Sequence, residues 1–234
     1  MACGRHRDAR LDSRACRAAP PVRAQGWIAE EDDSPMEMRM LPTVGASVLA
    51  VLMLAAVSGA AAEVKCFRGS QDTGELVFSG AVEETGFTGR FGQFSVEYCM
   101  PDGGPTDGRI EVRVQFSSAD TDNPERDETL KGEAFFAVDQ YPEASWKSQS
   151  ISAEGEAYVA DGELDLKGVR ASQAVNFTLT PNGDDLVARG EFNMRGGAEV
   201  ERLRFDVGTG EFSDPGFVRN RVDLSFEIRL VVED

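Results

Sequence analysis

Residues 125–146 have the sequence ERDETLKGEAFFAVDQYPEASW, and this stretch decides how the rest of the chain is interpreted. It is typical of one short helical segment that carries Phe135 and Phe136, whereas the segments on both sides alternate apolar and polar residues as strands do. Asn123 and Pro124 precede it as an expected N-cap and first helical residue. One helix among many strands predicts a closed sheet, with Phe135 and Phe136 against its apolar interior.

Period-two alternation recurs along much of the chain. Strands with one buried and one solvated face are predicted at residues 110–116, 175–179 and 222–230. Less regular strands are predicted at residues 76–82, 91–99, 145–151, 157–166, 186–194 and 200–207. Turns are predicted between them, notably at residues 102–105, 161–162, 181–183 and 196–197. The pattern indicates eight to ten strands, and one-sided sheets this numerous must close or pair up.

Residues 41–62 form an apolar stretch that follows Arg39 and ends in three alanines before Glu63. This organisation is typical of a secretory signal peptide. A transmembrane anchor is the alternative, because a membrane span takes about 20 apolar residues. The strongly apolar part, residues 44–57, is short for an anchor and favours the signal peptide.

A signal peptide must lie near the start of a chain, yet residues 1–35 precede this one and show no apolar periodicity. We expect residues 1–35 to be disordered and to result from a start codon assigned too far upstream. The signal peptide is then residues 36–62, and residues 63–234 form one domain. The product is expected to be periplasmic or secreted, and soluble once the signal peptide is removed.

Composition excludes several classes of partner and chemistry. The formal net charge of −17 disfavours binding to nucleic acid and to anionic headgroups, and it serves either solubility or an acidic docking surface. The single histidine, His6, lies outside the expected domain. Histidine metal ligands, Ser-His-Asp and Cys-His nucleophile systems and the usual near-neutral base are therefore not expected. We expect no catalytic residue and no metal site.

Two cysteines, Cys66 and Cys99, remain in the expected domain. They are too few for a zinc cluster. An even number of cysteines in an exported chain favours one disulfide, and two buried thiols are the alternative. Such a disulfide would stabilise the fold by roughly 3–4 kcal/mol, by restricting the unfolded chain.

The inward-facing aromatic residues permit two interpretations. Phe116, Phe177 and Phe226 lie on apolar faces of predicted strands and are core residues by default. An eight-stranded barrel, however, has an interior that side chains either fill or leave open for one small ligand. Periodicity does not choose between these outcomes.

Four segments, in order, resemble the YceI-like family of exported, lipocalin-like barrels that bind polyisoprenoid lipids. LVFSGAVEETGFTGRFGQFS (residues 76–95) is similar to the family's opening strands. The Arg-Asp, Leu, Phe-Phe and Tyr-Pro spacing of residues 126–142 matches its middle segment. YVADGELDLKGV (residues 158–169) resembles its strand–turn–strand, and RLRFDVGTGEF (residues 202–212) resembles the segment before its last strand. Asp206 departs from the pattern, which usually has a small residue there.

The resemblance implies an all-β fold, a single antiparallel lipocalin-like β-barrel of about eight strands with one short helix over the Phe135 side. It implies a binding protein rather than an enzyme. The expected ligand is an isoprenoid or similar amphiphilic lipid, with a quinone among the options, which the protein would carry or sequester. No cofactor is expected beyond this lipid. The residues expected to line the pocket are aromatic, namely Phe78, Phe116, Phe135, Phe136, Trp146, Phe177, Phe192 and Phe226.

Relatives fused to cytochrome b561-type membrane domains imply a membrane protein of that type as a partner. The oligomeric state stays open between monomer and dimer. Two alternative functions remain. One is an interaction protein with a filled core that acts through its acidic outer surface. The other is an enzyme that uses Asp or Glu on a bound lipid.

Overall fold

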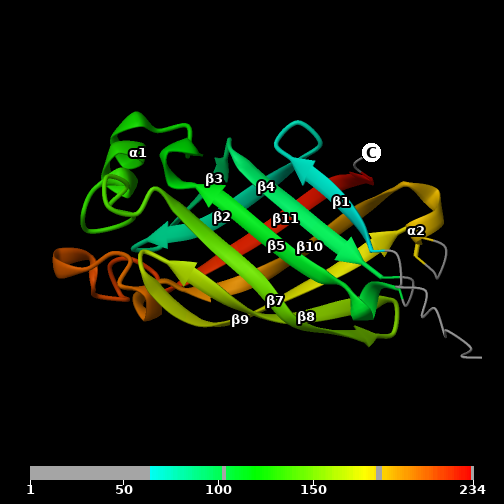
Figure 1. The fold of residues 1–234 in the computed structure, drawn as a ribbon. Coiled ribbons are helices and arrows are strands. Elements are labelled where there is room, and N and C mark those ends of the chain that lie inside the picture. Colours follow the sequence, from blue (N-terminus) through cyan, green and yellow to red (C-terminus); the bar gives the residue numbers. More distant parts are fainter. Residues whose placement is uncertain (1–63, 102–103, 183–185, 233–234) are drawn as a thin grey trace, which may run out of the picture. The chain divides into compact units, whose positions relative to one another are not determined.

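The computed structural model describes residues 64–101, 104–182 and 186–232, in which antiparallel strand segments join into one sheet (Figure 1). The strands are β1 (Lys65–Ser70), β2 (Gly74–Val82), β3 (Thr85–Phe91), β4 (Phe94–Met100), β5 (Arg109–Gln115), β6 (Ala119–Asp120), β7 (Glu143–Glu154), β8 (Ala157–Leu166), β9 (Val169–Thr180), β10 (Glu191–Glu201) and β11 (Arg221–Val232). Two short helices, α1 (Pro124–Lys131) and α2 (Leu186–Arg189), accompany them.

The sheet closes into a barrel because β1 pairs with both β4 and β11. Three of the barrel strands are each interrupted once. Their two halves are β1 and β2, β3 and β4, and β5 and β6. The hairpin of β2 and β3 pairs Phe78 with Gly89, and the same antiparallel pairing continues in β1 and β4, where Phe67 faces Tyr98. The segments therefore amount to an eight-stranded antiparallel barrel, which confirms the predicted fold class.

Helix α1 begins as the sequence predicts. The side chain of Asn123 accepts a hydrogen bond from the Arg126 backbone N–H, and Pro124 occupies the first turn. Helix α2, of four residues, was not predicted, because residues 186–194 alternate like a strand. The strand in that region begins only at Glu191.

Two predicted turns were wrong. Residues 161–162 lie inside β8, and residues 196–197 lie inside β10. At Gly162 and Gly196 a backbone carbonyl and an aromatic ring leave no room for a side chain. A Cβ on Gly162 would meet the Lys147 carbonyl and lie 2.6 Å from the Trp146 indole, and one on Gly196 would meet the Asn176 carbonyl and lie 2.7 Å from the Phe226 ring. The predicted strand at residues 200–207 was also wrong, because β10 ends at Glu201 and a 3₁₀ turn, Arg202–Phe205, follows.

One end of the barrel is packed with side chains. Phe67, Tyr98, Phe177 and Phe192 are buried there, with the Phe67 and Phe192 ring centroids 4.9 Å apart. The Tyr98 hydroxyl donates a 2.7 Å hydrogen bond to the carbonyl of Pro105, which follows β4. Helix α2 lies at this end, and α1 lies at the opposite end (Figure 1).

Cys66 on β1 and Cys99 on β4 are directly opposite each other and form a disulfide, as the sequence predicts. In the described part of the chain, helices are too short or too polar to cross a membrane. The expected signal peptide at residues 36–62 and the segment at residues 1–35 lie outside the described residues.

Candidate ligand-binding site

Two adjoining cavities lie inside the barrel. The first has a volume of about 120 Å³ and the second about 150 Å³. They share the wall residues Leu76, Val114, Ala144, Leu164, Val200 and Leu224. Strand alternation directs these side chains inward, and they leave space between them. The interior beyond the packed end is therefore open and apolar.

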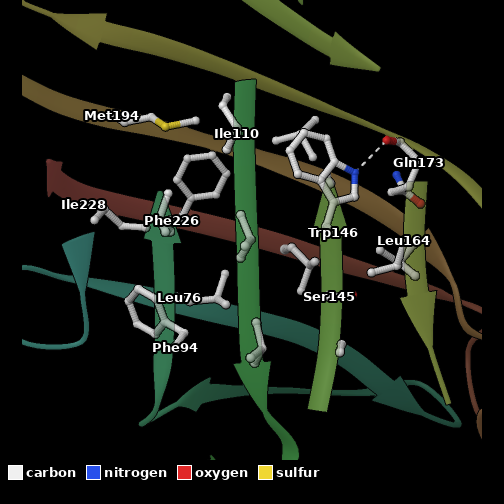
Figure 2. A pocket seen from close by; sticks show the side chains of 18 residues that line it. Leu76, Phe94, Ile110, Ser145, Trp146, Leu164, Gln173, Met194, Phe226 and Ile228 are labelled. Atoms are coloured by element: carbon white, nitrogen blue, oxygen red, sulfur yellow. Dashed lines mark hydrogen bonds between the residues drawn. The ribbon is translucent and has the colours of Figure 1, made fainter. Parts of the chain in front are cut away.

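The first cavity lies in the middle of the barrel, where Trp146 of β7, Met194 of β10 and Phe226 of β11 face it (Figure 2). The Trp146 indole Nε1 donates a 2.9 Å hydrogen bond to the backbone carbonyl of Gln173 on β9. Gly162 on β8 lies beneath the indole and leaves room for it. Among the described residues, the wall of this cavity is mostly aliphatic and aromatic, and Ser145 and Gln173 are its uncharged hydroxyl and amide side chains.

The second cavity lies toward the α1 end. Phe116 and Phe136 stack face to face on its wall, with ring centroids 4.4 Å apart. Phe78 lies on the same wall and packs against Phe91 with a centroid distance of 4.9 Å. Leu130 of α1 also lines this cavity. The helix therefore contributes to the wall through Leu130. The prediction that Phe135 and Phe136 lie on the helix was wrong, because α1 ends at Lys131 and the two rings belong to the turns that follow it.

A loop between β10 and β11, residues 202–219, covers the second cavity and is called the mouth loop here. The guanidinium of Arg202, only 3% exposed, holds it together through main-chain carbonyls. It donates hydrogen bonds of 2.6–3.1 Å to the carbonyls of Val207, Gly208, Phe212, Val218 and Arg219. Burial lowers the pKa of Arg202 from its ordinary value. Its role in the loop was not predicted, although it begins the RLRFDVGTGEF segment of the resemblance.

The mouth loop is tied to the segment that follows α1. The Gly208 N–H donates a 2.7 Å hydrogen bond to the carbonyl of Ala134. Lys167, at the turn between β8 and β9, donates to the carbonyls of Glu133 and Asp206 at 2.8 Å each. Burial lowers the pKa of Lys167, because its ammonium is partly removed from water. Asp206 adopts a left-handed backbone with φ of 55°.

Six of the eight predicted pocket residues lie on the cavity walls. Trp146 and Phe226 line the first cavity, and the second is lined by Phe78, Phe116, Phe135 and Phe136. Contact of these residues with a ligand stays a prediction. Phe177 and Phe192 line neither cavity but pack around Tyr98 at the filled end. Alternation tells which face of a strand a residue occupies, but not its depth along the barrel.

The aliphatic part of the wall was not singled out from the sequence. Leu164, Val200 and Leu224 line both cavities. Leucine and valine on an inward strand face are typical of any core, so their pattern does not distinguish a wall from a filled interior. Among the described residues, neither cavity wall includes a carboxylate.

Comparisons with known proteins agree with this architecture. The model of the YceI-like domain family matches residues 69–230. A UPF0312 protein of Photorhabdus laumondii is 30% identical over 124 residues, which cover 52% of this chain and 65% of that protein. This chain thus spans somewhat less than two thirds of that relative.

Two solved structures share the fold. BcnA of Burkholderia cenocepacia superposes with a TM-score of 0.60 at 23% identity, over 67% of this chain and 95% of BcnA. A polyisoprenoid binding domain from Saccharophagus degradans superposes with a TM-score of 0.54 at 14% identity, over 71% of this chain and 98% of that domain. Since the family match also spans most of the chain, including both cavity walls, the chain belongs to the YceI-like domain family.

Proposed function

We propose that this protein binds an isoprenoid or similar amphiphilic lipid, a quinone among the options, with its apolar chain in the two barrel cavities. The open apolar interior carries the proposal. A barrel that served only as a rigid scaffold would gain stability from side chains filling this space, because each unfilled volume forfeits packing contacts. Here Leu164, Leu224 and Phe226 line the first cavity and are only partly buried.

The dimensions favour a slender apolar chain. An apolar cavity of about 150 Å³ can stay dry and take up an apolar guest, and two such cavities adjoin here. Burial of a chain in a preformed channel gives about 0.8 kcal/mol per CH₂ group. The ordering cost to the protein is small, because the barrel wall is already in place.

Further support comes from the family and from the sequence. The Saccharophagus degradans domain with the same fold is a polyisoprenoid binding domain. A disulfide and the signal-peptide pattern both favour an exported protein that carries or sequesters the lipid. A cytochrome b561-type membrane protein is a partner consistent with a quinone ligand.

Mass spectrometry of an organic extract tests the proposal directly. The full chain is expressed with export and purified without detergent, and we expect a prenyl lipid or quinone in stoichiometric amount. Leu164→Trp is the matched variant, since it places a large ring where both cavities share a wall. It should lose the lipid and keep the circular dichroism spectrum of a barrel.

A clean extract would contradict the proposal if the protein also failed to take up added isoprenoid alcohols. The function would then have to lie on the acidic outer surface, and partner binding should weaken as salt screens the charges.

A further inference from the structure

Strands β9 and β10 are hydrogen-bonded to each other over only part of their length. Pairing runs from Asn176 with Gly197 to Thr180 with Asn193. Residues 169–175 of β9 pair with β8 alone, and residues 198–201 of β10 pair with β11 alone. Residues 169–175 and 198–201 thus have no backbone hydrogen bonds to each other. The gap between these two segments is called the β9–β10 slit.

The slit lies directly over the first cavity. Gln173 and Val200 line that cavity and also line a surface hollow of about 300 Å³. Ala198 and Leu224 line the same cavity and a second surface hollow of about 500 Å³. Single residues therefore face the ligand space on one side and solvent on the other.

Side chains take the place of the missing backbone ladder. Gln173 Nε2 donates across the slit to the carbonyl of Glu199 at 3.1 Å and back to Ala174 at 3.0 Å. Arg204 donates to the Ser172 carbonyl at 3.0 Å. From inside the barrel, the Trp146 indole Nε1 donates a hydrogen bond to the Gln173 backbone carbonyl (Figure 2). These side-chain hydrogen bonds can break by rotation of the side chains alone. Backbone hydrogen bonds between two strands break only when the strands separate.

The two ends of the barrel are closed more firmly. At one end, aromatic side chains around Tyr98 fill the interior. At the other end, Arg202 and Lys167 join the mouth loop, the β8–β9 turn and the segment after α1 by several hydrogen bonds. The β9–β10 slit is therefore a weakly connected part of the wall that lies directly over the first cavity.

We propose that the β9–β10 slit is a lateral portal, in which the uncharged polar end of the bound amphiphile emerges while its apolar chain lies in the cavity. This inference rests on the proposed function. When the slit opens, Gln173 Nε2 gives up the Glu199 carbonyl and can donate instead to an oxygen acceptor of the ligand, such as a hydroxyl or carbonyl group. Beside the slit, Arg221 is paired with both Glu199 and Asp223 at 2.7 Å, so its charge is already balanced and does not select an anionic end.

A disulfide across the slit tests the portal. Ala174 and Glu199 would face each other if the observed register continued, and both are exposed. The full chain carries Ala174→Cys and Glu199→Cys, with Trp27→Phe so that Trp146 is the only tryptophan. Uptake of all-trans-retinol, an isoprenoid alcohol, is followed by energy transfer from Trp146 in stopped flow. Peptide mapping verifies the new disulfide.

Oxidised Ala174→Cys/Glu199→Cys protein should take up and release retinol about tenfold more slowly or worse, because uptake scales with the population of the open wall. The matched Ala174→Ser/Glu199→Ser protein should keep the wild-type rates. A second control, Thr178→Cys/Arg195→Cys, bridges the part of β9 and β10 that is already paired and should also keep them. Wild-type rates in the oxidised slit variant would overturn the portal.

A single substitution gives an independent test that needs no disulfide. Gln173→Met keeps the volume of the side chain but loses its hydrogen bonds to Glu199 and Ala174. We expect retinol uptake to become several-fold faster. Unchanged uptake in this variant would count against Gln173 as the brace of the portal. If wild-type protein bound retinol but neither change altered the rates, the portal alone would fail; if wild-type protein took up no apolar chain, the proposed function would fail with it.

Discussion

Gly162 sets the position of the Trp146 indole on the cavity wall. A Cβ at this position would lie 2.6 Å from two atoms of the indole and would also meet the Lys147 carbonyl. Gly162→Ala should therefore displace the ring and destabilise the barrel by about 1–3 kcal/mol, the usual range for overpacking. Urea unfolding measures the stability, and the emission of Trp146 in the Trp27→Phe background reports the displacement.

The control for this prediction is Gly86→Ala, because the nearest atom to a Cβ there is 3.9 Å away. Its effect should stay within about 0.5 kcal/mol, as for most surface changes. An unshifted Trp146 emission spectrum in Gly162→Ala would contradict the proposed contact.

Tyr98 gives the packed end a specific pH dependence. Burial, with a smaller contribution from Tyr158, raises the pKa of its phenol above the ordinary value of 10.0. The folded state thus keeps this proton at a pH where the unfolded chain has lost it. The stability from this group is fully present below about pH 10 and declines as pH rises from there toward the folded-state pKa.

Tyr98→Phe tests this dependence. At pH 7 it should cost about 1 kcal/mol, since the hydrogen bond to the Pro105 carbonyl is lost. Above about pH 10 the free energy of unfolding should fall less steeply than in wild type, because the titrating phenol is gone. Urea unfolding at several pH values measures both. Equal slopes in the two proteins would show that Tyr98 does not cause the alkaline decline.

At the scale of elements, the sequence predicts the faces of strands better than their ends. Inward positions of β11, such as Leu224 and Phe226, follow from alternation alone. Gly162 and Gly196 are predicted to form turns, although at each a backbone carbonyl and an aromatic ring of neighbouring strands occupy the space that a Cβ would need. That contact joins residues distant in the sequence, so local pattern does not reveal it. The β9–β10 slit depends on register and is equally invisible in the sequence.

The segment after α1 is predicted to close the ligand space through Phe135. This side chain is 7% exposed, lines the second cavity and packs on Phe212 of the mouth loop at 4.9 Å. Phe135→Asp should weaken lipid retention about tenfold or more, because a carboxylate there must be buried without a partner or must push the segment outward. Retinol titration measures the affinity, and circular dichroism verifies the barrel.

Phe217→Asp is the matched control for this element. Phe217 lies in the mouth loop, is 39% exposed and lines neither cavity. The Phe217→Asp variant should bind retinol with the affinity of the wild-type protein. Equal losses in both variants would mean that added charge near the mouth loop, rather than the cavity wall, lowers the affinity.

Across the whole barrel, stability and binding reside in different places. Closure depends on β1, and up to Val232, where the described part of β11 ends, it pairs with β11 through Phe67 with Val232 and Arg68 with Val231. The disulfide joins β1 to β4 next to this short seam. The cavities, by contrast, are lined mainly by other segments, among them β2, α1 and the middle of the longer strands, with Phe94 and Val96 as the contribution of β4. Changes at the seam should therefore affect unfolding more than ligand affinity.

Cys66→Ala/Cys99→Ala separates the two properties. The disulfide closes a loop with a sequence separation of 33 residues, and its loss should lower the free energy of unfolding by about 3–4 kcal/mol, mainly because the unfolded chain gains entropy. Retinol affinity of the remaining folded protein should be unchanged, since neither residue lines a cavity. Urea unfolding and retinol titration below the transition measure the two quantities. A parallel loss of affinity would show instead that the closed seam holds the cavity walls in place.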